Sequence, residues 1–280
     1  VTTAKMAKSG LVEFKFAAVD GQTYRAVAVA YKGKKTVGTP EASLAYDYTG
    51  FDFTDGLGDA WSQWLDAGFG AKQRHCAAPL AENSTTSDGY AVLSVTHRPD
   101  LAAAAKSGGC SKANLKKSKV YGNAQVSTRT GFRVQSGIVE ARITFPKAKG
   151  MHAGVWLESD GPEIDMIEAY GAGQRITNVF HLSKKSPTTK SGTKENKLYS
   201  KKKSSSWYSK SHVVSLEWNT NHIVFRVDGK VTSAKKVGTP AMWYWLVMSN
   251  MTSDWELKSL KNSQLPTGMK VDWIRVWGNK

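Results

Sequence analysis

The 280-residue sequence lacks long apolar runs and has few good helical stretches, and both shortages exclude kinds of protein. No apolar run approaches the ~20 residues that a membrane-spanning helix needs, so we expect no membrane partner. The opening VTTAKMAKSG has no hydrophobic signal core, and we expect that any export signal has already been removed. Only DLAAAAKSG predicts a short helix, which Gly108 and Gly109 would end.

Cysteine is also scarce, with Cys76 and Cys110 as the whole complement. They lack the CxxC spacing and the accompanying histidine pair of a zinc site, so we expect no bound zinc. A disulfide is favoured, and closing a loop of about 34 residues would stabilise the fold by roughly 3–4 kcal/mol in the chain-entropy treatment. It would imply an oxidising compartment and therefore secretion. Two free thiols in a cytosolic protein are the alternative.

Negative charge is in short supply, because 39 Lys+Arg face 23 Asp+Glu and leave a net charge of +16. Eight lysines lie between Lys184 and Lys203, in a run of Ser, Thr, Gly and Pro that contains one acid, Glu195. Such a segment predicts a long, solvated loop. The charge indicates a polyanionic partner such as nucleic acid, an acidic polysaccharide or a charged cell wall, with solubility as the plainer interpretation. Nucleic acid is least favoured, since no recognised binding motif accompanies the lysines.

Period-2 patterns dominate the chain and predict strands bounded by Gly, Pro, Asn, Asp or Ser. The clearest examples are YAVLSVTH, GIVEARITF, HVVSLEW, HIVFRVDG, YWLVMSNM and MKVDWIRVW. Many short strands with turn signals predict an all-β sandwich or jelly roll. We expect residues 1–45 to form a β-hairpin extension, either the remnant of a fibronectin-III-like module or, as we favour, an appendage packed on the main domain of residues 46–280.

The stretch GPEIDMIEAYG, at residues 161–171, gathers three carboxylates among apolar residues. Glu163 and Asp165 share one strand face, and strict alternation would send Glu168 to the other. A one-residue β-bulge at Met166 and Ile167 would return Glu168 to their face, with the apolar residues in the core. Repulsion should raise at least one carboxyl pKa, which provides the acid and the nucleophile that glycosidic cleavage requires. An exposed acidic strand edge and a calcium site are the alternatives.

The EIDMIE core resembles the ExDxxE active-site motif of glycoside hydrolase family 16 in its bulged form. FDFTDGLGDAWSQW, GFRVQSGIVEARITFPKAKGMHAGVWL, VVSLEW, IVFRVDGK and VDWIRVW resemble further family segments in order and spacing, over about residues 46–280. The resemblance implies a β-jelly roll of two antiparallel sheets with a substrate cleft on the concave one. It also implies a retaining endo-glycosidase in which Glu163 is the nucleophile, Glu168 the general acid/base and Asp165 a hydrogen-bonding partner of the nucleophile. No cofactor is expected, although a structural calcium ion would fit the resemblance.

The same resemblance implies a set of substrate-binding residues, each with a plainer structural alternative. Histidine in the next strand, tryptophan in the preceding strand, and an Asn and a Trp near the last inner strand match family positions, and one further Asn is a weaker match. These residues are His181, Trp156, Asn250, Trp255 and Asn123. Core packing, a satisfied buried histidine and turn formation are the alternatives.

The sequence departs from the family's β-1,3-glucanases at two places that shape sugar subsites. Their usual Trp-Pro is replaced by Met151-His152, and the usual Ala-Val-Gly-Gly by residues 251–254. We therefore expect a monomeric, secreted hydrolase of a polysaccharide, with β-1,3-glucan as the default substrate. An anionic polysaccharide bound by the Lys-rich segment is the next hypothesis, followed by a transglycosylase and a non-catalytic glycan-binding protein.

Overall fold

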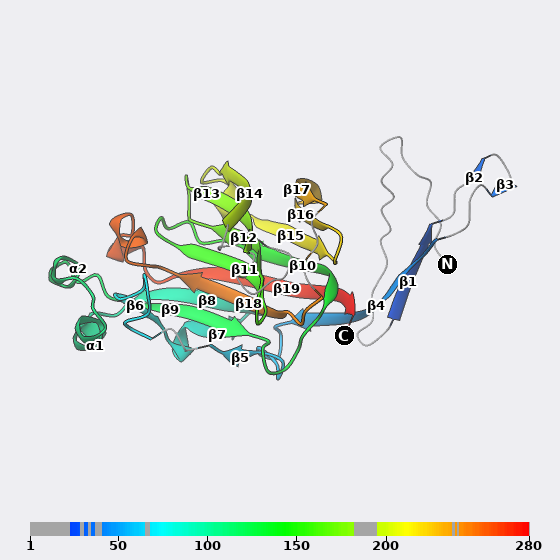
Figure 1. Cartoon of the computed structure of the whole chain (residues 1–280). Coiled ribbons are helices and arrows are strands. Elements are labelled where there is room, and N and C mark those ends of the chain that lie inside the picture. The colour runs from blue at the N-terminus through cyan, green and yellow to red at the C-terminus, as the bar shows by residue number, and fades with distance from the viewer. Residues whose placement is uncertain are drawn as a thin grey trace.

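The strands build a sandwich of two antiparallel sheets, as the computed structural model of the chain shows (Figure 1). The structure describes residues 23–28, 31–32, 35–36, 41–64, 68–181, 195–236, 239 and 241–279. Within these ranges, the all-β jelly-roll prediction is confirmed, and the strongly alternating segments lie in strands at the expected places.

One sheet carries the acidic motif, and we call it the site-bearing sheet. Its neighbouring strands are, in order, β14 (Glu195–Lys202), β13 (Arg175–His181), β12 (Glu163–Ala169), β11 (His152–Glu158), β18 (Trp245–Met251), β9 (Tyr121–Ser127) and β5 (Ser62–Gln63). The acidic strand β12 therefore lies inside the sheet, with a neighbour on each side.

The second layer, which we call the opposite sheet, covers the back of the first. Its order is β17 (Lys230–Lys235), β16 (Ile223–Val227), β15 (Ser211–Trp218), β10 (Ser136–Thr144) and β19 (Thr267–Asn279), followed by β8 (Tyr90–His97) with β7 (Ser84–Ser87), and β4 (Glu41–Asp52). Strand β8 also pairs with β9, and β6 (Ala77–Pro79) runs parallel to β9. These pairings join the two layers at one end.

The main core fills the space between the sheets, because every second residue of each strand points inward. Val155 and Leu157 of β11 belong to the same buried cluster as Val139 and Ala141 of β10. The remaining, alternate residues of β11 consequently point away from the core. The face of the site-bearing sheet that points away from the core, which we call the open face, is thus free to carry polar and aromatic side chains.

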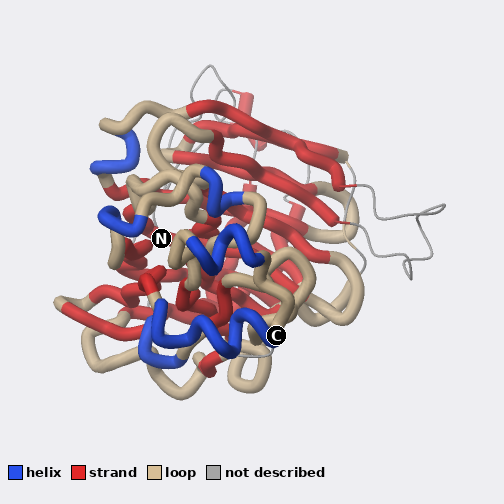
Figure 2. The backbone as a smooth tube through the Cα atoms, turned by 90° about the vertical axis from the view of Figure 1, so that its left-hand side faces the viewer, coloured by secondary structure: helices blue, strands red, loops and turns tan. Residues whose placement is uncertain are grey.

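A second, smaller core surrounds the disulfide between Cys76 and Cys110, which confirms the predicted pairing. Several short helices lie around it at one end of the sandwich (Figure 2). They include α1 (Ala102–Ser107), which follows η2 (Pro99–Leu101) and ends at Gly108 as predicted, and α2 (Lys112–Lys116), which the sequence analysis missed. The remaining 3-10 helices are η1 (Ala81–Asn83), η3 (Trp207–Ser209), η4 (Glu256–Lys258) and η5 (Asn262–Gln264). None of the helices in the described part is long and apolar enough to cross a membrane.

The N-terminal extension meets the main domain through a strand rather than a linker. Strand β1 (Thr23–Ala28) pairs with the first part of β4, whose second part pairs with β19. The expected boundary between residues 45 and 46 therefore falls inside β4, which runs outward from the sandwich (Figure 1). Strands β2 (Tyr31–Lys32) and β3 (Lys35–Thr36) form a small separate pair.

The Lys-rich segment is partly a strand, which corrects the prediction of a loop throughout residues 184–203. Residues 195–202 form β14, hydrogen-bonded along β13, and residues 184–194 lie outside the described part of the chain. Pairing with a neighbouring strand satisfies the backbone polar groups, so β14 needs no apolar composition of its own.

Strand β12 contains the predicted β-bulge. Val155 of β11 pairs with Ile167, whereas the next residue, Trp156, pairs with Asp165, so Met166 is the extra residue. The pairing of β12 with β13 shifts in the same interval. Both Met166 and Ile167 are buried in the main core, as expected.

We predict that Gly154→Ala displaces the bulge. A Cβ atom at Gly154 would lie 2.7 Å from the carbonyl oxygen of Ile167, a contact that the backbone of β12 must relieve by moving. Overpacking of this kind costs about 1–3 kcal/mol, and misplacing the adjacent Glu168 by an ångström costs about 10²-fold in kcat. Thermal unfolding and kcat measure the two effects. Gly68→Ala is the control, since a Cβ there meets nothing within 4 Å. Unchanged activity in Gly154→Ala would contradict the role of the bulge.

Candidate active site

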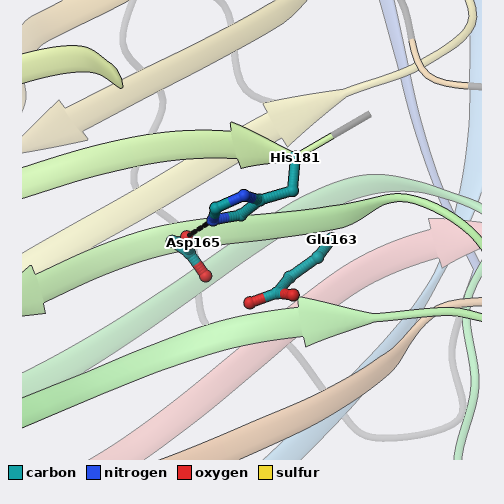
Figure 3. Close-up of side chains that lie close together, drawn as sticks. All are labelled: Glu163, Asp165 and His181. Carbon is teal, nitrogen blue, oxygen red and sulfur yellow. Dashed lines mark hydrogen bonds and ion pairs between the residues drawn. The ribbon is translucent and has the colours of Figure 1, made fainter. Parts of the chain in front are cut away.

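Two carboxylates and a histidine meet on the face of the site-bearing sheet that points away from the core (Figure 3). Glu163 and Asp165 come from β12, and His181 comes from the end of β13, paired directly with Glu163. One ligand atom from each of the three lies within 4.8 Å of the others. His181 Nε2 is 2.9 Å from Asp165 Oδ2, and Asp165 is only 4% exposed. The histidine therefore holds the central carboxyl in place.

Burial and the crowding of negative charge raise the pKa of Glu163 to about 10. Burial is the largest cause, followed by the charges of Asp165 and Glu158. Glu158, at the end of β11, is a third acid of this group, and its pKa rises to about 7 through burial and the charge of Asp165. Burial also raises the pKa of Asp165, against the opposing hydrogen bond of His181. This part of the site consequently retains a proton at neutral pH.

Glu168 has the opposite environment, because three donors surround its carboxylate. Thr177 Oγ1 donates to Oε2 at 2.6 Å, Tyr170 OH donates to Oε1 at 3.1 Å, and His152 Nε2 lies 2.5 Å from Oε1. Burial alone would raise the pKa of Glu168, but the hydrogen bond and positive charge of His152, with the other donors, lower it to about 2. Glu168 is therefore ionised in the free protein.

A second carboxylate lies behind His152. Its Nδ1 atom is 3.7 Å from Oε1 of Glu256, whose side chain is almost completely buried. Ser253 Oγ donates to the other carboxylate oxygen of Glu256 at 2.8 Å. Burial would lower the pKa of His152, but Glu168 and Glu256 together raise it. The imidazole thus lies between two acids.

An open hollow of about 290 Å³ adjoins Glu168 on the open face. Its lining includes Tyr170, Thr177 and Trp255, with Gln174 and Arg175 along the β13 side. Trp255 is 55% exposed, and its ring lies 6.3 Å from that of Tyr170. An exposed aromatic face beside a carboxylate provides a surface on which a sugar ring could stack.

Three of the five expected substrate-binding residues lie on or beside the open face. Trp156 projects from β11 on the same side as Glu158 and donates a hydrogen bond from Nε1 to Ser249 Oγ at 3.1 Å. His181 and Trp255 occupy the positions described above. Their contacts with substrate stay a prediction.

The structure places Asn250 and Asn123 away from the open face, which corrects their expected role. Asn250 is fully buried and donates to the carbonyl oxygens of Leu93 and Thr267 in the opposite sheet. Asn123 is also fully buried and exchanges two hydrogen bonds with the backbone of Thr252. Both amides satisfy buried backbone groups and so stabilise the scaffold.

Sequence reasoning missed several residues that complete the site, namely His152, Glu158, Tyr170, Thr177 and Glu256. Glu158 and Tyr170 carry a signal, because each continues the outward-facing alternation of a predicted strand. The sequence carries no such signal for Glu256, because this residue follows a loop whose path the sequence does not define. His152 was noted only as a departure from the family pattern.

The cluster of Glu163, Asp165 and His181 has a spacing that could also accommodate a metal ion. The histidine nitrogen facing the cluster already bonds Asp165, and the retained proton described above lowers the negative charge that would attract a cation. We therefore interpret the cluster as catalytic carboxylates, and the expected absence of a cofactor stays a prediction.

Comparisons with known proteins identify the family and the fold of the chain. The model of the family "Glycosyl hydrolases family 16" matches residues 88–275, which is more than half of the chain. No curated protein matches the sequence. Among solved structures, the non-specific endo-β-1,3(4)-glucanase SCLam superimposes with a TM-score of 0.66 at 19% identity, over 84% of this chain and 92% of that one.

Two further structures are similar in the same way. The laminarinase catalytic domain of Thermotoga maritima has a TM-score of 0.64 at 17% identity, over 84% of this chain and 99% of its own. A protein described among endo-acting O-glycanases of the human gut microbiota, which initiate mucin breakdown, has a TM-score of 0.64 at 21% identity, over 84% and 91% of the two chains. At these identities the likenesses establish the fold.

Proposed function

The chain belongs to glycosyl hydrolases family 16, and on that premise we propose that it is a secreted, retaining endo-glycosidase acting on a β-linked polysaccharide. The bulged strand β12 carries this proposal, because it brings Glu163, Asp165 and Glu168 to one face beside an open hollow. A β-1,3-glucan is the default substrate, supported by the glucanases among the structural neighbours. The disulfide supports an oxidising, extracellular location, and we propose a monomer.

In the proposed mechanism, Glu163 attacks the anomeric carbon while Glu168 protonates the leaving oxygen. A covalent glycosyl-enzyme forms on Glu163, and water activated by Glu168 then releases the sugar. Asp165, held by His181, lies next to Glu163 and orients it. Trp255 and Tyr170 would carry the sugar on the leaving-group side.

The ionisation of the free protein is the reverse of these roles, since Glu163 retains a proton and Glu168 is ionised. Substrate changes both environments. Positive charge develops at the anomeric carbon beside Glu163 in the transition state and favours its carboxylate form. The proton needed by Glu168 is available from His152, in contact with it. Assignment of Glu163 as nucleophile follows the family motif, and the ionisation alone would favour Glu168.

The first test is the release of reducing ends from β-1,3-glucan, mixed-linkage glucan, agarose, carrageenan and hyaluronan. We expect the wild type to cleave one of these polymers, and Glu163→Gln to lose at least about 10³-fold in kcat because the amide cannot form the glycosyl ester. Asp228→Asn, in the turn between β16 and β17 of the opposite sheet, is the control for a lost carboxylate. Binding without cleavage by the wild type would move the proposal to a glycan-binding protein.

A mechanism-based 2-deoxy-2-fluoro glycoside of the cleaved polymer then assigns the roles. Mass spectrometry of the peptide containing residues 163–168 should place the covalent label on Glu163. A label on Glu168 would reverse the assignment, and inversion of the product's anomeric configuration would exclude the retaining mechanism. Product sizing with an added sugar acceptor separates a hydrolase from a transglycosylase, which uses the same residues.

An anionic polysaccharide is the second candidate substrate, because positive charge lies along the hollow beside Glu168. Arg175 lines the hollow and is exposed. Lys202 pairs with Arg175 in the β13–β14 register, so the two side chains project from the same face of the sheet. A guanidinium at this position matches the geometry of a sulfate or carboxylate group on the sugar.

Arg175→Gln separates the two substrate classes. If the polymer is anionic, we expect KM to rise severalfold in the variant, and the salt dependence of the wild-type KM to become shallower because one screened contact is gone. On a neutral glucan, neither quantity should change. Arg142→Gln, which removes an exposed arginine from the opposite sheet, is the matched control. Cleavage of a sulfated or uronate-containing polymer with salt-independent kinetics would contradict the anionic contact.

A further inference from the structure

Resting on the proposed function, we propose that His152 is a positioning residue that, supported by Glu256, holds the proton which Glu168 gives to the leaving oxygen. The ring reaches Glu168 because β11 runs beside β12 and His152 projects from the open face.

The contacts at both ring nitrogens carry the inference. Nε2 is 2.5 Å from Glu168 Oε1, and Nδ1 is 3.7 Å from Glu256 Oε1. A neutral imidazole has only one N–H and could serve only one of these carboxyl groups. The facing oxygen of Glu256 is buried and has no hydrogen-bond partner. An imidazolium donates a hydrogen bond to Glu168 through Nε2 and brings its positive charge within ion-pair distance of Glu256, so the arrangement favours the protonated ring.

Of the charged groups around the ring, the two acids favour this state and one arginine opposes it. Glu168 and Glu256 raise the pKa of His152 against its burial, and Arg74 opposes them more weakly. The ring of Tyr170 lies tilted beside that of His152, at 4.8 Å between ring centroids, and stays neutral, since burial and the adjacent Glu168 raise the pKa of its phenol. The proton is therefore stored one hydrogen bond away from the group that uses it.

The second hydrophobic core fixes this arrangement. Met151 and Leu257, the chain neighbours of His152 and Glu256, are both buried in the cluster that contains the disulfide. Arg74 Nη1 donates to Thr252 O at 3.1 Å, which ties the segment before Glu256 to the same region. A rigid support keeps the two acids and the imidazole at their short separations.

The proton balance closes over one turnover. In the first step the glycosidic C–O bond breaks and its electron pair goes to the leaving oxygen, which takes a proton from Glu168 as Glu168 takes one from His152. When substrate binds, Glu163 releases its retained proton to solvent, and the resulting carboxylate forms the new bond to the anomeric carbon; solvent returns this proton to Glu163 after the product leaves. In the second step water forms the C–O bond, the bond to Glu163 breaks, and the water proton returns through Glu168 to His152.

The first experiment compares two aryl β-laminaribiosides with wild type, His152→Gln and Glu256→Gln. Phenol leaves only with protonation, whereas 2,4-dinitrophenol leaves without it. Because general acid catalysis contributes about 10²–10⁴-fold, we expect His152→Gln to lose about 10²-fold in kcat/KM on the phenyl substrate and little on the dinitrophenyl one. The glutamine keeps a donor near Glu168 but holds no transferable proton. The basic limb of the pH profile should also move in both variants.

The second measurement needs no substrate. In ¹H–¹³C NMR, the His152 imidazole, identified by its loss in His152→Gln, should remain protonated well above the ordinary pKa of ~6.5. In Glu168→Gln it should titrate at lower pH. His222→Gln is the matched control, because His222 pairs with Glu217 on the opposite sheet at 3.0 Å. It should leave the kinetics and the His152 signal unchanged.

The outcomes distinguish this inference from the proposed function. Cleavage by wild type together with equal losses on both aryl substrates, or a wild-type pH profile in His152→Gln, would overturn the proton-holding role and leave the glycosidase intact. A His152 ring that titrates below ~6.5 in the wild type would overturn it as well. If no polymer or glycoside is cleaved, the proposed function fails, and the NMR titration still decides whether the ring is held protonated.

Discussion

A single extra residue in β12 is the constraint on which the site depends. Ordinary strand alternation would place either Glu168 or its apolar neighbours on the wrong side of the sheet. The bulge lets Met166 and Ile167 both enter the core while Glu163, Asp165 and Glu168 stay on the open face. Gly154 makes room for it, because a side chain there would press against the bulged carbonyl. The acids are thus positioned by burial of the residues between them.

The site then divides into two electrostatic halves along the same strand. Around Glu163, acids from β11 and β12 crowd together in a partly buried place, and a proton is retained. Around Glu168, hydroxyl and imidazole donors converge, and the carboxylate is ionised. Two groups from one short motif acquire opposite ionisation because different neighbouring strands and loops surround them. A retaining reaction needs the reverse, with Glu163 as a carboxylate and a proton on Glu168. In our proposals, the bound substrate favours the first change and the proton on His152 supplies the second.

The disulfide end of the molecule takes part in this chemistry through its packing. The small core around Cys76 and Cys110 buries the neighbours of His152 and Glu256, and Asp254 accepts hydrogen bonds from the backbone of His75 and Cys76. The loop between β18 and η4, which presents Trp255 to the hollow, is held by the same contacts. The sequence identifies this region only by its predicted disulfide, yet in the structure the region supports the leaving-group side of the site.

The sequence by itself determined the strongly alternating strands, the bulge, the disulfide and the three acids, because period-2 burial, a broken alternation and cysteine pairing are local or compositional signals. It did not determine to which side of the sheet Asn250 points, since β18 carries apolar residues on both sides and shows no polar–apolar alternation. For Asn250 the family pattern led to a wrong prediction. Only the tertiary structure brought His152 and Glu256 together beside Glu168. Their contact depends on the register of β11 against β12 and on the packing of a distant loop, which no local periodicity encodes.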